Sequence, residues 1–443
     1  MKSGNGRTII LGAGLAGLSA AYHGGGTVYE GSDRFGGTCI SPRINGYTFD
    51  LGIHVLHTRD EYVIGLLRDI LKINLVDRKR SARLYSFDRL TRYPIQANTF
   101  GLPAPIVKDC LVSFIETYCE RKRNGKQRCD NYEKWLVAAF GRGIAEHFMI
   151  PYSEKFWTVH PRNMTTDWLD VRIPMPALHE VVEGALTDQT REFGPNAIFR
   201  YPLRNGISAI PGAFVRNGVK VSLNKKAVKI DIKKKEIEFA DGTRQNYDVL
   251  ISTIPLPELV NIANVPAAVS QAAGRLKYNS ILCVNLGIDK ANINTNHWIY
   301  YPEKKYSFFR ISFLKNFSST MAPAARSSIT AEIAYSGKKK IDRDEIAGDV
   351  IKDLVSAKIL TKKDKVELAD IRDIPYGYVI YNRERAGNLR KIRSFFRKNA
   401  VVLAGRYGNW DYQWMDDAIL DGKKAAGEAA DRYLSDKGGS VKK

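Results

Sequence analysis

Short apolar runs rich in β-branched residues alternate along this chain with glycine-rich turns and with stretches of helical periodicity. The first run, residues 8–11, is followed at once by the turn sequence Gly-Ala-Gly-Leu-Ala-Gly at residues 12–17 and then by a helical pattern. This order predicts a strand, a tight turn and a helix. Gly12 permits the turn, Gly14 lets a pyrophosphate approach the bare backbone, and Gly17 lets helix and strand pack closely. The pattern therefore predicts a dinucleotide, with its phosphates at the helix N-terminus.

A second strand is predicted at residues 27–30, and Glu30 ends it. An acid about 20 residues after the first glycine of such a turn holds ribose hydroxyls and favours an unphosphorylated ribose. Residues 31–38, Gly-Ser-Asp-Arg-Phe-Gly-Gly-Thr, resemble the Arg-x-Gly-Gly extension of glutathione-reductase-like flavoproteins, which lies along the FAD pyrophosphate. This extension favours FAD over NAD, and an ordinary glycine-rich turn is the alternative.

Downstream, helical and strand patterns follow one another in blocks. Residues 47–58 predict a strand that ends in a Gly-His turn, and residues 59–150 are mainly helical in period, with an interruption at the proline of residues 92–96. Further strands are predicted at residues 219–223, 228–232, 236–239, 248–254, 280–287, 297–301, 307–313, 328–335 and 400–406. Asp241-Gly242 is a hairpin signal, and a last helix is predicted from about residue 415 to residue 433.

These blocks predict an α/β protein with a discontinuous, Rossmann-like FAD-binding domain. A helical domain and a mixed or antiparallel β-sheet substrate domain are inserted into it. The expected FAD domain comprises residues 1–60, 205–265 and 395–443, the helical insertion residues 61–150, and the substrate domain residues 151–204 and 266–394. Residues 435–443 are expected to form a disordered tail.

Composition places the chain among ordinary globular proteins, with 44% hydrophobic and 26% charged residues in 443. No apolar run approaches the ~18 residues of a membrane span, so a cytoplasmic protein is expected. The five cysteines are scattered without CxxC spacing, which argues against a disulfide framework and against a zinc site.

The formal net charge of +21 is large, but lysine and arginine are spread along the chain. Only short clusters occur, at residues 233–235, 338–340 and 442–443. A solvated basic surface is the expected consequence, and no nucleic-acid partner is expected. A non-catalytic polyanion-binding protein is the alternative, which salt-dependent nucleic-acid binding without flavin would support.

Six segments of the chain, in the right order, resemble the motifs of the flavin-dependent UDP-galactopyranose mutases. In that family the counterparts of residues 51–58 lie beside the isoalloxazine, those of 93–96 meet the uracil, and those of 151–157 form part of the nucleotide pocket. Residues 194–202 and 308–312 resemble the segments with the diphosphate-binding arginines, here Arg200 and Arg310, and residues 405–416 resemble the flavin-contacting C-terminal motif.

The resemblance implies a set of site residues. The implied catalytic residues are His54, Arg200 and Arg310, with the flavin N5 as nucleophile. The implied FAD-binding residues are Gly12, Gly14, Leu15, Ala16, Gly17, Glu30, Arg34, Gly36, Gly37, Thr38, Gly52, His54, Val228, Gly405, Arg406, Tyr412, Met415 and Asp416. The implied substrate-binding residues are Tyr93, Gln96, Tyr152, Ser153, Trp157, Arg200, Trp298, Tyr300, Arg310, Tyr378, Arg406 and Tyr412.

Elementary chemistry agrees with two arginines at a diphosphate, because guanidinium stays charged and binds oxyanions through two hydrogen bonds. Arg200 and Arg310 lie in apolar, aromatic stretches where a charge needs an anionic partner, and a protein carboxylate is the alternative partner. His54 is expected either to orient the flavin edge or to be a structural histidine. His54 and His57 have no third ligand in the sequence, so no metal site is expected.

The resemblance implies a redox-neutral interconversion of UDP-galactopyranose and UDP-galactofuranose. The N5 of reduced FAD attacks the anomeric carbon, UDP stays bound, and the sugar recloses through its other hydroxyl. NAD(P)H is a candidate reductant, and a mobile loop near Gly52 or residues 155–163 is expected to exclude water. Phe317, Ser153 and Val379 depart from the family pattern, which leaves UDP-N-acetylgalactosamine or another nucleotide hexose open as substrate.

The competing interpretation is an FAD oxidase of the amine oxidase or protoporphyrinogen oxidase type. Such enzymes share the N-terminal motif and the C-terminal Gly-Arg strand, but they need no diphosphate-binding arginines. Oxygen consumption with an amine or a polycyclic substrate would favour this interpretation. The sequence does not define the oligomeric state, so a homo-oligomer is left open.

Overall fold

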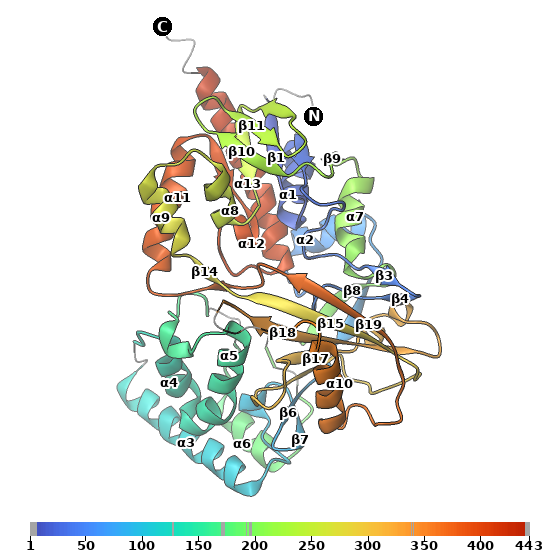
Figure 1. Cartoon of the computed structure of the whole chain (residues 1–443). Coiled ribbons are helices and arrows are strands. Elements are labelled where there is room, and N and C mark those ends of the chain that lie inside the picture. Colours follow the sequence, from blue (N-terminus) through green and yellow to red (C-terminus); the bar gives the residue numbers. More distant parts are fainter. Residues whose placement is uncertain are drawn as a thin grey trace.

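The computed structural model describes residues 7–125, 128–169, 173–191, 193–194, 197–337, 339 and 341–438. Figure 1 shows two ends separated by a long sheet, with both chain termini at the upper end and a group of helices at the lower end. The segments of the upper end come from the beginning, the middle and the end of the sequence, as the colours of Figure 1 show. The chain therefore leaves and re-enters the upper end several times.

A parallel sheet forms the centre of the upper end. It consists of β1 (Thr8–Leu11), β2 (Thr27–Tyr29), β9 (Val221–Ser222), β13 (Val249–Ser252) and β21 (Val401–Leu403), in the order β21-β13-β1-β2-β9. Helix α1 (Leu15–Gly24) packs against α13 (Met415–Gly438), and α7 (Ala209–Arg216) packs against α1. Because both faces of a parallel sheet are covered, its strands are apolar runs, and all four residues of β13 are buried.

A smaller antiparallel sheet lies beside it. It consists of β10 (Ala227–Asp231), β11 (Glu236–Phe239) and β12 (Arg244–Asn246), and the predicted hairpin turn joins β11 to β12 with Gly242 at φ +80°. The remaining upper elements are α8 (Leu256–Ile262), α9 (Ala267–Gly274), α11 (Arg385–Lys398), α12 (Gly405–Gly408) and a short ribbon of β14 (Lys277–Tyr278) with β20 (Val379–Ile380).

A seven-stranded sheet crosses the middle of the molecule. Its strands are β6 (Ala82–Ser86), β7 (Arg89–Arg92), β15 (Ser280–Ile288), β16 (Trp298–Tyr300), β17 (Arg310–Ser312), β18 (Ser327–Tyr335) and β19 (Val366–Ile374), in the order β19-β15-β18-β17-β16-β6-β7. All pairs are antiparallel except β16 with β6. Together with the parallel sheet, this mixed sheet confirms the predicted fold class.

The two faces of the seven-stranded sheet have different neighbours. Alternate residues of β15, among them Leu282 and Val284, pack against helix α10 (Ile346–Ser356). The residues between them, among them Ile281 and Cys283, belong to the larger core on the other face. Since side chains alternate between the faces of a strand, this second face is free to line a site.

The lower end is helical. It contains α3 (Ala104–Asn124), α4 (Tyr132–Ile144), α5 (Ile150–Trp157) and α6 (Leu178–Leu186), with a π-helical turn at Ala145–Met149. Helices α3 and α4 approach closely at Gly143, where an added Cβ would lie 2.6 Å from the Asp109 carbonyl oxygen. Glycine therefore sets the distance between these two helices.

The helical prediction for residues 59–150 is wrong at its beginning. After α2 (Glu61–Gly65) and a π-helical turn (Leu66–Ile70), the chain forms β5 (Leu75–Lys79), β6 and β7. Strand β6 pairs with β16, and β5 pairs with β8 (Ile198–Pro202). Pairing with partners more than a hundred residues away decides the conformation here, and a local pattern does not contain that information.

The strand predicted at residues 47–58 is also shorter than expected. Only β4 (Tyr47–Thr48), paired with β3 (Arg43–Ile44), is a strand, and the following residues form an irregular loop. Asp50 fixes this loop, because its carboxylate accepts hydrogen bonds from Ser41 Oγ (2.6 Å), Tyr201 Oη (2.5 Å) and the Ile207 N–H (3.2 Å). Burial raises the pKa of Asp50 to about 6.

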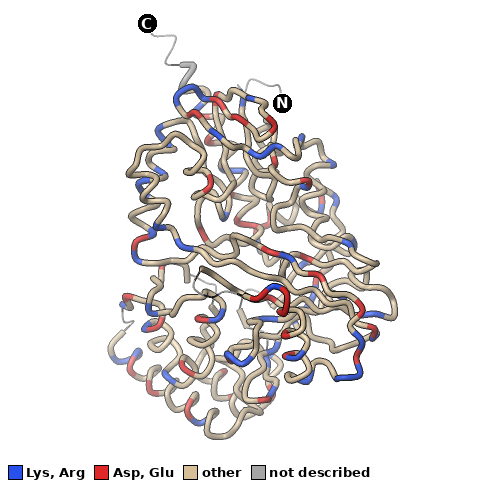
Figure 2. Tube along the Cα trace, in the orientation of Figure 1, with Lys and Arg blue, Asp and Glu red and all other residues tan. Residues whose placement is uncertain are grey.

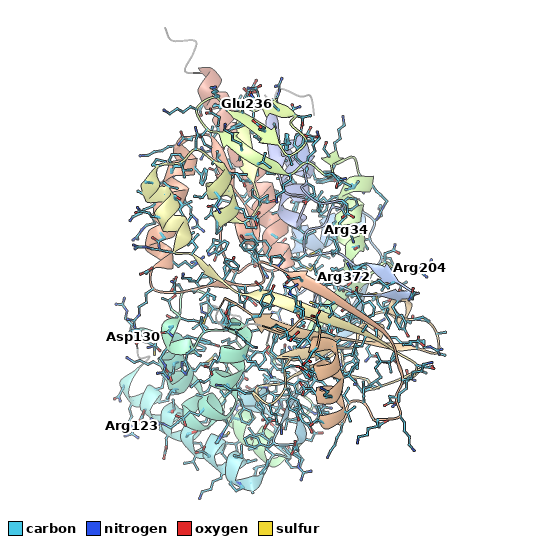
Figure 3. All side chains as sticks on the ribbon, in the orientation of Figure 1. Arg34, Arg123, Asp130, Arg204, Glu236 and Arg372 are labelled. Atoms are coloured by element: carbon cyan, nitrogen blue, oxygen red, sulfur yellow. The ribbon has the colours of Figure 1, made fainter. Side chains whose placement is uncertain are left out.

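Charged side chains cover both ends of the molecule. Lys and Arg occur along the trace in both the upper and the lower parts of Figure 2. In Figure 3, Glu236 lies at the upper end, and Arg123 and Asp130 lie at the lower end. No helix in the described part of the chain is long and apolar enough to cross a membrane.

The last helix is longer than predicted. Helix α13 continues to Gly438, five residues beyond the predicted end of the last helix at residue 433, so the first part of the expected tail is helical. Residues 439–443 and two lysines of the basic cluster, Lys338 and Lys340, lie outside the described residues.

Candidate active site

Two cavities adjoin each other, one beside the parallel sheet and one beside the seven-stranded sheet. The first, of about 700 Å³, runs along the glycine-rich turn after β1 and past the end of β2. The second, of about 320 Å³, lies between the seven-stranded sheet and the helical end. Residues that line both cavities are Thr38, His54, Arg406, Tyr407, Trp414 and Met415. A ligand in the first cavity therefore meets a ligand in the second at these residues.

The glycine-rich turn has the geometry that a pyrophosphate requires. An added Cβ at Gly17 would lie 2.0 Å from the Gly12 carbonyl oxygen, so helix and turn pack with no room for a side chain. At Gly14, no atom lies within 4 Å of such a Cβ, and Gly14 lines the first cavity. The bare backbone before α1 is thus open to an anion at the helix N-terminus. The first cavity fits the flavin dinucleotide that the sequence predicts.

Glu30 lines the first cavity, but its carboxylate also organises the protein. Its Oε2 accepts a hydrogen bond from the Ala13 N–H (2.8 Å), and its Oε1 accepts hydrogen bonds from the Ser32 N–H and Oγ (both 2.9 Å). These bonds join the turn after β1 to the turn after β2. The carboxylate is therefore fixed at the place where a ribose is expected.

Most residues implied in FAD binding line the first cavity, and six do not. Those that line it are Gly12, Gly14, Leu15, Ala16, Glu30, Gly36, Gly37, Thr38, His54, Gly405, Arg406 and Met415. Gly52 and Tyr412 line the second cavity instead. Gly17 supports the turn, and Asp416 lies outside both linings.

Arg34 and Val228 are the other two predicted FAD residues that the structure places elsewhere. The Arg34 guanidinium pairs with Asp33 (2.8 Å) at the surface, and local pairing of these neighbours draws it out of the cavity. The Val228 side chain is 42% exposed, because side chains alternate along β10 and Ala227 faces the cavity. Only the main chain of Val228 is left for a cofactor contact.

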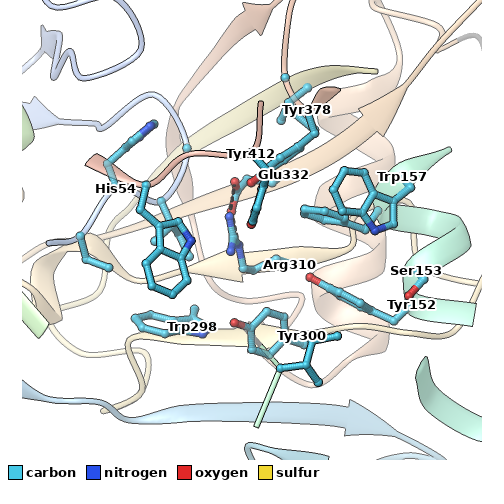
Figure 4. Close-up of a pocket in the computed structure, with 18 of the residues that line it drawn as sticks. His54, Tyr152, Ser153, Trp157, Trp298, Tyr300, Arg310, Glu332, Tyr378 and Tyr412 are labelled. Carbon is cyan, nitrogen blue, oxygen red and sulfur yellow. Dashed lines mark hydrogen bonds and ion pairs between the residues drawn. The ribbon is translucent and has the colours of Figure 1, made fainter. Parts of the chain in front are cut away.

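His54 lies at the junction of the two cavities (Figure 4). Its Nδ1 is buried and has no hydrogen-bond partner among the described residues. Burial, with the nearby Arg406 and Arg310 charges, lowers the pKa of His54 to about 4. His57, also in the second cavity, has its pKa lowered to about 3 by burial and by Arg80. Both imidazoles are therefore neutral at pH 7.

Arg406 also lies at the junction. Its Nε (3.0 Å) and Nη2 (2.5 Å) donate to the Gln413 carbonyl oxygen, and its guanidinium lies 5.4 Å and 5.3 Å from the ring centres of Tyr378 and Tyr412. No ion pair of the described residues includes Arg406. Burial disfavours its charge, yet the surrounding tyrosines hold its pKa above the usual value. Arg406 is thus a buried cation that no carboxylate in the described part of the chain pairs with.

Arg310 and Glu332 form a two-point ion pair in the second cavity (Figure 4). Arg310 Nε donates to Glu332 Oε2 (2.5 Å) and Nη2 donates to Oε1 (2.7 Å). Their side chains are only 12% and 4% exposed. Burial alone would lower the pKa of Arg310, but the Glu332 carboxylate raises it well above the usual value. Arg310 therefore has the protein carboxylate that sequence analysis gave as its alternative partner, although Glu332 itself was not identified there.

Arg200 is not brought into either cavity. Antiparallel pairing of β5 with β8 places it opposite Asp77, and its Nε lies 3.2 Å from the Asp77 carboxylate. Its Nη1 donates to the Thr58 carbonyl oxygen (2.8 Å). The alternative that this arginine pairs with a protein carboxylate therefore holds, and the prediction that it contacts substrate has no support in the structure. Pro195 and Asn196 of the same motif lie outside the described residues.

Aromatic rings form the walls of the second cavity, as Figure 4 shows. Ring centres of neighbours lie 5.0 Å apart for Tyr93 and Tyr300, 5.5 Å for Tyr152 and Tyr300, and 5.8 Å for Tyr378 and Tyr412. All predicted substrate residues except Arg200 line this cavity: Tyr93, Gln96, Tyr152, Ser153, Trp157, Trp298, Tyr300, Arg310, Tyr378, Arg406 and Tyr412.

Amide and hydroxyl groups also line the second cavity. Gln96 Nε2 donates to the Pro174 carbonyl oxygen (2.9 Å), so its Oε1 is the atom left for a ligand. Ser153 Oγ lies 3.4 Å from the hydroxyl of Tyr132, which sequence analysis did not identify. The other departures from the family pattern lie elsewhere, since Phe317 and Val379 are buried outside both linings.

Lys155, within the motif at residues 151–157, stabilises the local structure. Its Nζ donates to the carbonyl oxygens of Tyr301 (3.0 Å) and Glu303 (2.8 Å), which fastens α5 to the loop after β16. Burial lowers the pKa of Lys155 to about 7. Other residues of the motif, including Tyr152 and Trp157, are thereby held at the cavity.

Comparisons with known proteins agree with this architecture. A protein-family profile described as flavin containing amine oxidoreductase matches residues 15–430. The solved structure of reduced UDP-galactopyranose mutase superposes with a TM-score of 0.89 at 26% identity, covering 96% of this chain and 93% of that chain.

Relatives with oxidase names are more distant. A solved putative protoporphyrinogen oxidase from Exiguobacterium sp. 255-15 superposes with a TM-score of 0.73 at 16% identity, covering 97% of this chain and 99% of that one. The coproporphyrinogen III oxidase of Staphylococcus aureus (strain NCTC 8325 / PS 47) is 20% identical, over 95% of this chain and 98% of its own length. The resemblance to the mutases is confirmed, and the chain belongs to the family of flavin containing amine oxidoreductases.

Proposed function

We propose that this flavoenzyme is a UDP-galactopyranose mutase that interconverts UDP-galactopyranose and UDP-galactofuranose. The observation that carries the proposal is the charge of the second cavity. Arg310 is balanced by Glu332, His54 and His57 are neutral, and Arg406 has no carboxylate among the described residues. A buried net positive charge favours an anionic ligand and opposes an ammonium ion, the substrate form of an amine.

The walls of the cavity support a nucleotide sugar in particular. Rings such as Tyr93, Trp157 and Tyr300 offer flat apolar surfaces to a base, and Gln96 Oε1 offers an acceptor to a donor on its edge. A diphosphate placed between base and flavin would lie near Arg310 and Arg406. The sugar would then lie at the junction beside His54.

The chemistry divides between cofactor and protein. FAD, when bound and reduced, supplies the nucleophile for the anomeric carbon. The role proposed for Arg310 and Arg406 is to hold the departing diphosphate in place, so that it can return to the sugar. The role proposed for neutral His54 is to orient the ring edge at the junction without adding a charge. We also propose that NAD(P)H reduces the flavin and that the protein acts in the cytoplasm.

A porphyrinogen oxidase is the second candidate, because two relatives with such names cover nearly the whole chain. Its substrate is also a carboxylate anion, so the charge of the cavity alone does not separate the two. The aromatic walls and the amide at Gln96 favour the nucleotide.

Isothermal titration of the purified flavoprotein tests the proposal. We expect UDP to bind at micromolar concentration, with affinity that falls as salt rises, and putrescine not to bind. Absence of UDP binding, together with oxygen uptake on coproporphyrinogen or on an amine, would reject the mutase in favour of an oxidase.

A further inference from the structure

Glu332 occupies a position in the second cavity that neither the sequence motifs nor the comparisons assign. It lies on β18 directly opposite Arg310 on β17, and the same cross-strand row continues to Tyr300 on β16. All three residues line the cavity. A carboxylate in a cavity that takes an anion is unfavourable unless it does something for the neighbouring cation.

The geometry of the pair shows what Glu332 does. Both of its oxygens are used, one on Nε and one on Nη2 of Arg310. A planar guanidinium held through two parallel hydrogen bonds cannot rotate about its long side chain. Both N–H groups of Nη1 and the second N–H group of Nη2 remain as donors, and they belong to a side chain that lines the cavity.

The loop at Gly52 leaves room for the Glu332 carboxylate. Gly52 has φ +76°, and an added Cβ there would lie 3.1 Å from Glu332 Oε1. Glu332 is 3% exposed, and Cys283 faces it from β15. The carboxylate is thus confined by the sheet and by this loop, and it has one orientation in which to hold the arginine.

We propose that Glu332 is a positioning residue for substrate binding, which acts by locking the Arg310 guanidinium so that its Nη1 edge meets the diphosphate. This inference rests on the proposed function for the identity of the anion. A carboxylate that only diluted the positive charge would weaken UDP binding, so its neutralisation would strengthen it. A positioning carboxylate has the opposite effect, because the arginine loses its orientation when the pair is broken.

The test is a double-mutant cycle read by UDP titration. Glu332→Gln keeps the shape of the side chain but places an amide donor against the arginine donors, and we expect it to weaken UDP binding about tenfold. In the Arg310→Ala background the same change should not weaken UDP binding and should strengthen it, because Glu332 has nothing left to orient and its unpaired carboxylate repels the diphosphate. Glu332→Asp, which keeps the carboxylate, should recover part of the loss.

Glu367→Gln is the matched control, since Glu367 lies on the outer strand β19 and pairs with Tyr47 and Arg326 away from both cavities. Its UDP affinity should equal that of the wild type. Bound-flavin absorbance and the melting temperature of each variant show whether it is folded. Tighter or unchanged UDP binding in folded Glu332→Gln, or an equal loss with and without Arg310, would overturn the inference. If wild-type protein binds no UDP at all, the proposed function fails instead.

Discussion

Three arginines near the cavities have three different electrostatic partners. Arg200 is paired with Asp77 outside the cavities, Arg310 is paired with Glu332 inside, and Arg406 is held by the Gln413 carbonyl oxygen. A carbonyl oxygen orients a guanidinium but does not neutralise it. Arg406 is therefore the side chain whose charge a bound anion would compensate most fully.

Arg406→Ala should weaken UDP binding by about tenfold to a hundredfold, the usual range for loss of a charged hydrogen bond. Arg200→Ala is the matched comparison, and it should change UDP affinity less than about twofold because Arg200 lies outside the cavity lining. Titration of both variants with UDP is the measurement. Equal losses in the two variants would show that Arg200 reaches the ligand after all.

Asp50 makes the stability of the fold depend on pH. Its folded pKa of about 6 lies above the unfolded value near about 3.9, so the folded state binds the extra proton between these values. Stability should therefore fall as pH rises from about 4 to about 6, by up to about 3 kcal/mol.

Asp50→Asn removes this titration. Denaturant unfolding of the wild type and of the variant at pH 4, 5, 6 and 7 gives the difference in unfolding free energy between them. As pH rises from 4 to 6, we expect the unfolding free energy of the wild type to fall relative to that of the variant. Between pH 6 and pH 7 the difference should change little. A difference that does not vary with pH would contradict the assignment.

At the scale of elements, the close contact of α3 with α4 depends on glycine. Gly143→Ala would place a Cβ 2.6 Å from the Asp109 carbonyl oxygen, and overpacking of this kind costs about 1–3 kcal/mol. Gly387→Ala in α11 is the control, since no atom lies within 4 Å of its Cβ, and it should be neutral or slightly stabilising. Thermal melting of both variants distinguishes these outcomes. A Gly143→Ala melting temperature equal to that of the wild type would show that the helices can separate without cost.

Elements with a strong local period could be predicted, and elements that depend on distant partners could not. The turn after β1, the strands β11, β15 and β18 and the helix α13 lie close to their expected positions. Residues of β5, β6 and β7 lie in the block that the sequence predicts to be mainly helical. The prediction fails there because β5 and β6 form strands by pairing with the distant strands β8 and β16.

The candidate site shows the same division. Motif residues such as Tyr93, Trp157 and Arg310 line the second cavity as predicted from the resemblance. Glu332 was missed because only the register of β17 with β18 joins it to Arg310. The pairing of Arg200 with Asp77 could not be predicted for the corresponding reason, since it depends on the register of β5 with β8.

At the scale of the whole molecule, the site exists only where distant parts of the chain meet. Segments at residues 51–58 and 405–416 come from opposite ends of the sequence, yet His54 and Arg406 share the junction of the two cavities. The upper end supplies the dinucleotide cavity, and the seven-stranded sheet and lower helices supply the other (Figure 1). A flavin bound in the first cavity would therefore meet a ligand of the second cavity at their shared residues.

The measurement that tests this account most directly is turnover of UDP-galactofuranose. Purified protein reduced with dithionite under argon is incubated with it, and formation of UDP-galactopyranose is followed by chromatography beside an air-oxidised sample. We predict conversion in the reduced sample and none in the oxidised one, because the reaction needs reduced flavin but consumes no electrons. A flavin-loaded, reduced protein that converts nothing, and that in air consumes oxygen with a porphyrinogen or an amine, would contradict the account.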